Sequence, residues 1–112
     1  MDKLAAYYAQ RAAEYERIYA KPERQADLAA LRTRIGKLSA GKKVLELACG
    51  TGYWTEVMAA SAAQVTALDV NEEVLQIART KSYPESRAQI IFGDCYSPPI
   101  AGRSHDVLFA GF

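Results

Sequence analysis

The chain has 112 residues, which is enough for one modest domain with a hydrophobic core. Its 14 basic and 13 acidic side chains leave a net charge of +1, so the composition indicates neither a nucleic-acid nor a membrane partner. The start of the chain lacks the apolar run of a signal peptide, and no stretch approaches the roughly 18 apolar residues of a membrane span, so we expect a cytoplasmic protein.

The first 40 residues are expected to form a helical lead-in. Residues 3–19 are rich in Ala, Glu and Arg and lack Gly and Pro, which predicts a helix with tyrosines along one face. Pro22 then suits the first turn of a second helix, which ends before Gly41. That helix carries a narrow apolar stripe suited to docking on a sheet, made of Leu28, Leu31, Ile35 and Leu38.

From residue 41 onward, short apolar runs alternate with helical segments. We expect strands at 43–48, 64–70, 88–93 and 106–110, and helices at 53–63 and after Asn71, which caps the second of these helices. Strands that are apolar on both faces indicate a parallel sheet covered by helices. The predicted fold class is therefore α/β: a three-layer, Rossmann-like parallel sheet of about four strands, with N-terminal helices.

The last predicted strand has no helix after it to cover it. A parallel sheet that ends on a bare edge strand is unfavourable. We therefore expect residues 1–40 to form a lead-in or lid, and residues 41–112 to form an α/β core that is truncated after its fourth strand and belongs to a longer enzyme. The bare edge also offers a surface for a homodimer.

Cysteine and histidine usage argues against a metal or a disulfide. Cys49 and Cys95 are expected to be free thiols in a reducing compartment. The single histidine, His105, and two separated cysteines give no ligand cluster with usable spacing, so we expect no metal site.

The stretch Val44–Gly52 (VLELACGTG) joins a predicted strand to a predicted helix. Gly50 and Gly52 permit a tight turn and the close approach of a ligand to the backbone. Thr55 stands where the dinucleotide fingerprint has its third glycine, and the absence of Gly-Lys-Ser/Thr excludes a nucleoside-triphosphate loop. Glu46 lies inside the apolar strand, where a carboxylate is costly unless it is paired, so we expect it to serve the site.

Two aspartates end the next two predicted strands. Asp69 follows Gly52 at the end of the second strand, where a carboxylate can accept both hydroxyls of a ribose. Asp94 ends the third strand and could accept a hydrogen bond from an exocyclic amine such as that of adenine. The carboxyl ends of parallel strands meet at one edge of the sheet, so these residues and the glycine loop are predicted to converge on one ligand.

Four segments in order resemble the successive cofactor motifs of class I S-adenosylmethionine-dependent methyltransferases: VLELACGTG, LDVN, FGDC and DVLFAGF. The family usually has Asp or Gly where this chain has Ala48 and Cys49. The resemblance covers about the first half of a typical member. It implies S-adenosylmethionine as cofactor and methyl transfer to a small-molecule acceptor. Because a sulfonium already makes its methyl group electrophilic, no particular catalytic side chain is implied.

The resemblance also implies roles for individual residues. Ligands to the cofactor would come from each motif in turn: Glu46 and the loop Ala48, Cys49, Gly50 and Gly52 for the methionine part; Asp69, with Val70 and Asn71 beside it, for the ribose; Asp94 and Cys95 for the adenine; and Phe109 to Gly111 at the methyl-donor end. In similar methyltransferases a tyrosine and an arginine of the lead-in helix fold over the cofactor carboxylate, and the candidates are Tyr7, Tyr8, Arg11 and Tyr15.

Two other functions remain open at this point. A nicotinamide-dependent oxidoreductase shares the strand, glycine loop and acidic residue, although the third glycine is absent. A non-catalytic binding module could instead associate through its bare sheet edge. The tyrosine face of the first helix could also serve packing alone, since aromatic helix faces pack more often than they bind ligands.

Overall fold

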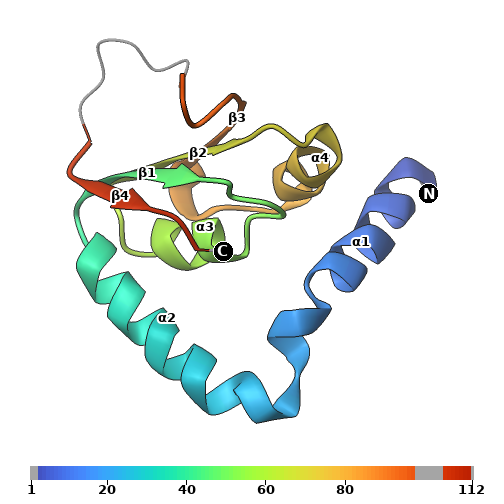
Figure 1. The fold of residues 1–112 in the computed structure, drawn as a ribbon, viewed down its shortest axis with the longest axis horizontal. Coiled ribbons are helices and arrows are strands. Elements are labelled where there is room, and N and C mark those ends of the chain that lie inside the picture. The colour runs from blue at the N-terminus through green and yellow to red at the C-terminus, as the bar shows by residue number, and fades with distance from the viewer. Residues whose placement is uncertain (1–2, 98–104, 112) are drawn as a thin grey trace.

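The structure of the chain is a computed structural model, and it describes residues 3–97 and 105–111. Helices and strands alternate after a helical N-terminal segment (Figure 1). In chain order the elements are α1 (Lys3–Tyr15), η1 (Arg17–Ala20), η2 (Pro22–Arg24), α2 (Gln25–Ser39), β1 (Lys43–Leu47), α3 (Tyr53–Ala59), β2 (Gln64–Asp69), α4 (Glu72–Thr80), η3 (Pro84–Ser86), β3 (Ala88–Phe92) and β4 (Val107–Phe109).

The four strands form one parallel sheet in the order β3-β2-β1-β4. Val44 of β1 lies opposite Val65 of β2 and Val107 of β4, so the register is continuous across the middle of the sheet. The chain moves outward from β1 through β2 to β3 and then returns to the other side of β1. The predicted parallel α/β fold is confirmed, and the reversal beside β1 brings the ends of β1, β2 and β4 to one edge (Figure 1).

The core lies between the sheet and one layer of helices. Leu28 of α2, Met58 of α3 and Leu75 of α4 are fully buried in one cluster with Val44 and Val65. Burying side chains of this size is worth about 1.5–3 kcal/mol each, which makes this cluster the main source of stability. The helices therefore dock on the face of the sheet that these valines occupy.

The opposite face of the sheet carries the alternate residues of the strands. Leu45 and Leu47 are half-buried there, and Leu108, which pairs with Leu45, is 66% exposed. The described residues thus form two of the three predicted layers, the sheet and one helical layer. Within these residues no helix has the length and apolarity that crossing a membrane requires.

Two predicted helix boundaries were wrong. The first helix ends at Tyr15 rather than Tyr19, because the chain turns into η1 and places the Tyr19 ring flat against Tyr53. The helix after the glycine loop ends at Ala59 rather than Ala63, where Ser61 donates its hydroxyl to the Gly36 carbonyl of α2. In both cases a contact distant in sequence prevails over local helix propensity.

Candidate functional site

The loop between β1 and α3 is held in a conformation that ordinary residues avoid. Three of its residues have left-handed backbones: Ala48 at φ 53°, Gly50 at φ 57° and Gly52 at φ 87°. A methyl group on Gly52 would lie 2.5 Å from the Tyr83 hydroxyl, whereas one on Gly50 would meet no atom within 4 Å. Gly52 is therefore required by packing, and Gly50 leaves open space above the loop.

Asp69, at the end of β2, fixes this loop. Its Oδ2 accepts the N–H of Gly50 at 2.9 Å, and its Oδ1 accepts the N–H of Asn71 at 2.9 Å. Asn71 in turn caps α4, since its Oδ1 accepts the N–H groups of Glu73 (3.0 Å) and Val74 (3.4 Å). The predicted cap is confirmed. One half-buried carboxylate thus connects the glycine loop to the start of α4.

Glu46 lies beneath the loop rather than in it. Its side chain points to the helix-covered face of the sheet, is 2% exposed, and accepts the Thr55 hydroxyl of α3. Burial raises the pKa of Glu46 to about 7; the Thr55 hydrogen bond opposes this rise, and the nearby negative charge of Asp69 adds to it. Glu46 lines none of the described cavities, so its contact with the loop runs through the start of α3.

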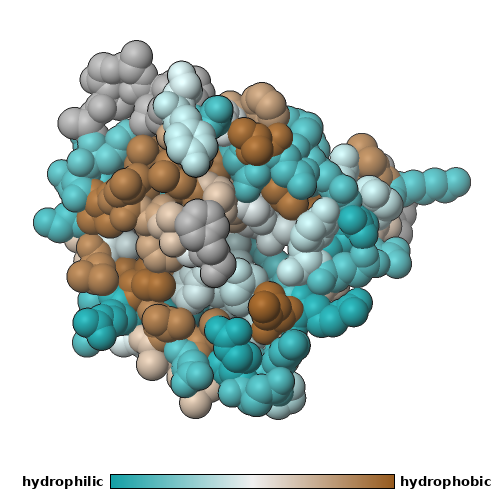
Figure 2. Space-filling model, viewed as in Figure 1, coloured by the Kyte–Doolittle hydropathy of each residue, from teal (hydrophilic) through white to brown (hydrophobic). Residues whose placement is uncertain are grey.

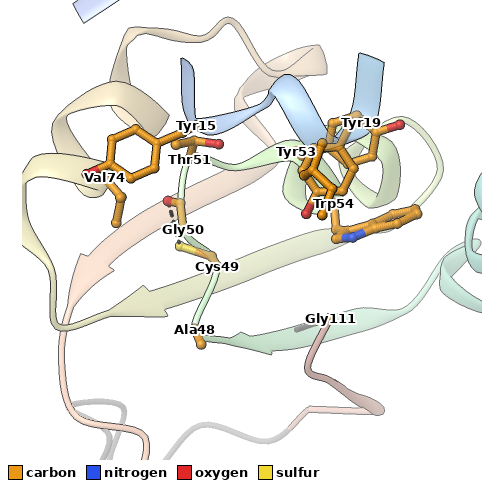
Figure 3. Close-up of a pocket in the computed structure, with 11 residues that line it drawn as sticks. Tyr15, Tyr19, Ala48, Cys49, Gly50, Thr51, Tyr53, Trp54, Val74 and Gly111 are labelled. Carbon is orange, nitrogen blue, oxygen red and sulfur yellow. Dashed lines mark hydrogen bonds between the residues drawn. The ribbon is translucent and has the colours of Figure 1, made fainter. Parts of the chain in front are cut away.

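Two cavities of about 180 Å³ each open on the two sides of the loop. The first, called the loop cavity here, is shown in Figure 3. In that view Tyr15 and Val74 lie to the left of Gly50, Thr51 lies above it, and Tyr19, Tyr53 and Trp54 lie to the right. Its lining is Tyr15, Ile18, Tyr19, Ala48, Cys49, Gly50, Thr51, Tyr53, Trp54, Val74 and Gly111.

The second cavity, called the strand-end cavity here, lies across the ends of β2 and β3. Its lining is Ala48, Asp69, Val70, Gly93, Asp94, Cys95 and Tyr96. Asp94 is ordered by a tight turn in which its Oδ1 accepts the Tyr96 N–H at 2.9 Å. Ala48 lines both cavities, so a ligand that passes over this residue would occupy the two together.

An aromatic cluster closes one wall of the loop cavity. The rings of Tyr19 and Tyr53 stack with centroids 3.9 Å apart, and Trp54 stands edge-on to Tyr53 at 5.0 Å. The ring centroid of Phe109, in β4, lies 6.2 Å from that of Trp54. Aromatic pairs at these separations are favourable beyond their buried area. The cluster therefore joins η1, α3 and β4 around the cavity.

The N-terminal helix α1 is attached by side-chain ion pairs. Arg11 bonds Glu73 of α4 at 2.6 Å and Glu14 at 2.5 Å. Just beyond α1, Glu16 accepts hydrogen bonds from the Thr51 hydroxyl (2.8 Å) and from the Lys81 ammonium. No residue of α1 is buried. The lead-in segment is thus linked to the glycine loop mainly through Glu16.

A family model matches the part of the chain that begins at the second residue of β1. Residues 44–112 match the family described as "Methyltransferase domain". This range is more than half of the chain and contains the loop, both aspartates and β4. The chain belongs to this methyltransferase family.

Individual relatives of this methyltransferase domain are similar in sequence and fold. The demethylmenaquinone methyltransferase of Staphylococcus epidermidis is 33% identical over 75 residues, 64% of this chain and 31% of that protein. The solved structure titled "DhpI-SAH complex structure" matches with a TM-score of 0.60 and 33% identity, over 95% of this chain and 50% of that one. The chain spans about a third to a half of the length of these relatives.

A methyltransferase of Aquifex aeolicus shares the fold, with a TM-score of 0.67 at 20% identity over 87% of this chain and 55% of that one. Together with the sheet order, this match confirms the predicted Rossmann-like architecture.

The methyltransferase domain brings most of the predicted site residues together. Ala48, Cys49, Gly50 and Tyr15 line the loop cavity, while Asp69, Val70, Asp94 and Cys95 line the strand-end cavity. Six predicted residues line neither cavity. Among them, Glu46 is beneath the loop, Arg11 is paired with Glu73, Tyr7 is exposed against Tyr8, and Gly52 packs against Tyr83. Asn71 acts as the cap of α4, and Phe109 contacts the loop cavity only through Trp54.

Sequence reasoning did not select several residues that line the loop cavity. Thr51, Val74 and Tyr19 come from three separate segments. Thr51 could have been found from its place inside the glycine loop. Tyr19 and Val74 carried no local signal, because both read as ordinary helix-face residues. Gly111 was noted only as part of a segment, yet a methyl group there would lie 2.9 Å from Trp54 Cδ1.

Proposed function

We propose that the chain is the cofactor-binding part of an S-adenosylmethionine-dependent methyltransferase. The observation that carries this proposal is the pair of cavities that share Ala48, the second of which is lined by Asp69 and Asp94. A nucleoside joined to an amino acid can place its nucleoside in the strand-end cavity and its amino acid in the loop cavity. DhpI, which is 33–34% identical to this chain, has been solved in complexes titled with SAH and with SAM.

The residues present fit this cofactor. Each oxygen of Asp69 accepts one backbone N–H and keeps a lone pair that can accept a ribose hydroxyl. Asp94 lines the same cavity, and its carboxylate can accept a hydrogen bond from the exocyclic amine of an adenine. Thr51, Tyr15 and Tyr19 line the loop cavity, and the hydroxyl groups of such residues can bond the polar end of an amino acid.

In this proposal the chain contributes binding and alignment. When bound, S-adenosylmethionine supplies a methyl group that is already electrophilic. Asp69 orients the ribose, and the aromatic wall of Tyr19, Tyr53 and Trp54 excludes water from the loop cavity. Residues 3–20 act as a lid that Glu16 holds against Thr51, whereas α2 belongs to the core through Leu28. We further propose that the acceptor is a small molecule, which the near-neutral net charge and the small volume of the cavities support.

Calorimetry with S-adenosylhomocysteine tests the proposal. We expect binding to the wild type, and more than tenfold weaker binding to Asp69→Ala, because two charge-assisted hydrogen bonds are lost. Asp69→Asn keeps one acceptor oxygen and should fall between the two. Asp27→Ala, on an exposed position of α2, is the matched control and should bind like the wild type. No binding at millimolar ligand, or binding of NAD instead, would overturn the proposal.

A further inference from the structure

A third cavity, larger than the other two, lies beside the loop cavity. Its volume is about 300 Å³, and residues of η1, η2, α2, α3, β4 and the segment that follows β4 line it. Its described lining is Ile18, Tyr19, Arg24, Leu31, Ile35, Trp54, Phe109, Ala110 and Gly111. Ile18, Tyr19, Trp54 and Gly111 also line the loop cavity, so the two cavities are direct neighbours.

The walls of this third cavity are mostly apolar. Leu31 is 41% exposed and Ile18 is 50% exposed, although both sit in regular helical segments of a folded domain. Figure 2 shows apolar side chains gathered over α2 and β4, the elements on either side of the cavity. Exposed apolar side chains that surround a concavity are typical of a ligand site.

Arg24 is the one charged side chain in the described lining of this cavity. It is half-buried, and none of the carboxylates of residues 3–97 and 105–111 forms an ion pair with it. Other half-buried arginines do have partners: Arg11 bonds Glu73 and Arg87 bonds Glu85. Arg24 therefore lines the cavity with a guanidinium that no described carboxylate neutralises.

The backbone that carries Arg24 is fixed. Pro22 begins η2, and the Arg24 N–H donates to the Lys21 carbonyl at 3.0 Å. The Gln25 side chain donates to the carbonyls of Tyr19 (2.9 Å) and Lys21 (3.0 Å), which closes the turn. A guanidinium on a fixed turn loses less entropy when it binds an anion than one on a mobile chain.

We infer that this third cavity binds the methyl acceptor, and that the acceptor is a small organic acid whose apolar body fills the cavity and whose anionic group pairs with Arg24. That this ligand is the methyl acceptor rests on the proposed function, because the third cavity borders the loop cavity through Tyr19, Trp54 and Gly111. The chemistry of the ligand follows from the lining alone. An arginine bonds a carboxylate through two parallel hydrogen bonds, and apolar walls favour an aliphatic or aromatic body.

The test compares 3-phenylpropionate with its neutral amide, 3-phenylpropionamide, by calorimetry on the protein saturated with S-adenosylhomocysteine. We expect the acid to bind about tenfold more tightly than the amide, the usual effect of one charge-assisted hydrogen-bonded pair. Arg24→Gln should weaken binding of the acid about tenfold and leave binding of the amide unchanged. Arg24→Lys should recover part of the loss, because it restores the charge without the paired geometry.

Arg17→Gln is the matched control, since Arg17 is exposed on η1 and lines none of the described cavities. The inference is overturned if acid and amide bind equally, if neither binds, or if Arg17→Gln weakens the acid as much as Arg24→Gln. Titration without S-adenosylhomocysteine separates this result from the proposed function. Acid binding that depends on Arg24 supports the organic-acid site even if the nucleoside does not bind. Nucleoside binding without acid binding refutes the site alone.

Discussion

The glycine loop and the N-terminal helix both border the loop cavity, yet they are held by different kinds of interaction. The loop is fixed by backbone conformation and by backbone N–H groups bonded to Asp69. Helix α1 has no buried residue and is attached through the side chains of Arg11 and Glu16. A helix with no buried residue detaches more easily than a loop that is fixed by its own backbone conformation. The loop is thus a rigid platform, and the lead-in segment is suited to opening.

The rigidity of the loop is tested most severely at its glycines. Gly52→Ala should lower the free energy of unfolding by about 3–5 kcal/mol, since it adds a left-handed alanine and displaces Tyr83, whose hydroxyl bonds the Ala78 carbonyl at 2.7 Å. Urea denaturation measures the loss. Gly50→Ala is the matched variant. It carries similar backbone strain without a clash, so it should lose less stability and should instead weaken binding of S-adenosylhomocysteine. Equal losses of stability would contradict this distinction.

The buried carboxylate beneath the loop gives a pH-dependent prediction. Because the pKa of Glu46 is raised from 4.5 to about 7, the folded chain holds this proton more tightly than the unfolded chain. Its stabilising effect is present below pH 4.5 and is lost as the pH rises through about 7. Glu46→Gln should remove this dependence and gain up to about 3 kcal/mol relative to the wild type between pH 5 and pH 8.

Denaturation curves at several pH values measure this effect. The exposed Glu23→Gln is the control and should leave the pH dependence of the wild type unchanged. A wild-type stability that is flat between pH 5 and pH 8 would contradict the raised pKa of Glu46, and a Glu46→Gln variant that retains the slope would assign it to another group.

The attachment of the lead-in segment is tested at Glu16. Glu16→Gln keeps an acceptor for Thr51 but removes the ion pair with Lys81, in which both side chains are mostly buried. We expect a loss of about 1–2 kcal/mol, together with faster tryptic cleavage at Arg17 and Lys21. Lys81→Gln should reproduce the effect. If cleavage is unchanged while stability falls, the pair supports the core rather than the lead-in segment.

The smallest expected effect is a gain. Ala48 has a left-handed backbone, so Ala48→Gly should relieve strain and raise stability by about 0.5–1 kcal/mol after the greater entropy of the unfolded glycine is subtracted. Ala60→Gly, at the right-handed end of α3, is the control and should lower stability by a similar amount. Two changes of the same sign would argue against strain at Ala48.

Much of the platform could be predicted from the sequence because its signals are local. Alternating apolar runs and helices indicated the parallel sheet. The glycines of VLELACGTG marked a turn, and Asn71 before two glutamates marked a helix start. Asp69, Val70, Asp94 and Cys95 were grouped correctly because the ends of parallel strands meet at one edge.

The surroundings of the site were decided only by the tertiary structure. Tyr19 and Gly111 line the loop cavity through contacts with α3 and β4, and the pairing of Arg11 with Glu73 joins residues far apart in the chain. The free guanidinium of Arg24 is likewise visible only once its neighbours are known. Periodicity and turn residues report interactions within a few positions of the chain. Which distant side chains neutralise a charge or close a cavity depends on packing, and no local pattern encodes it.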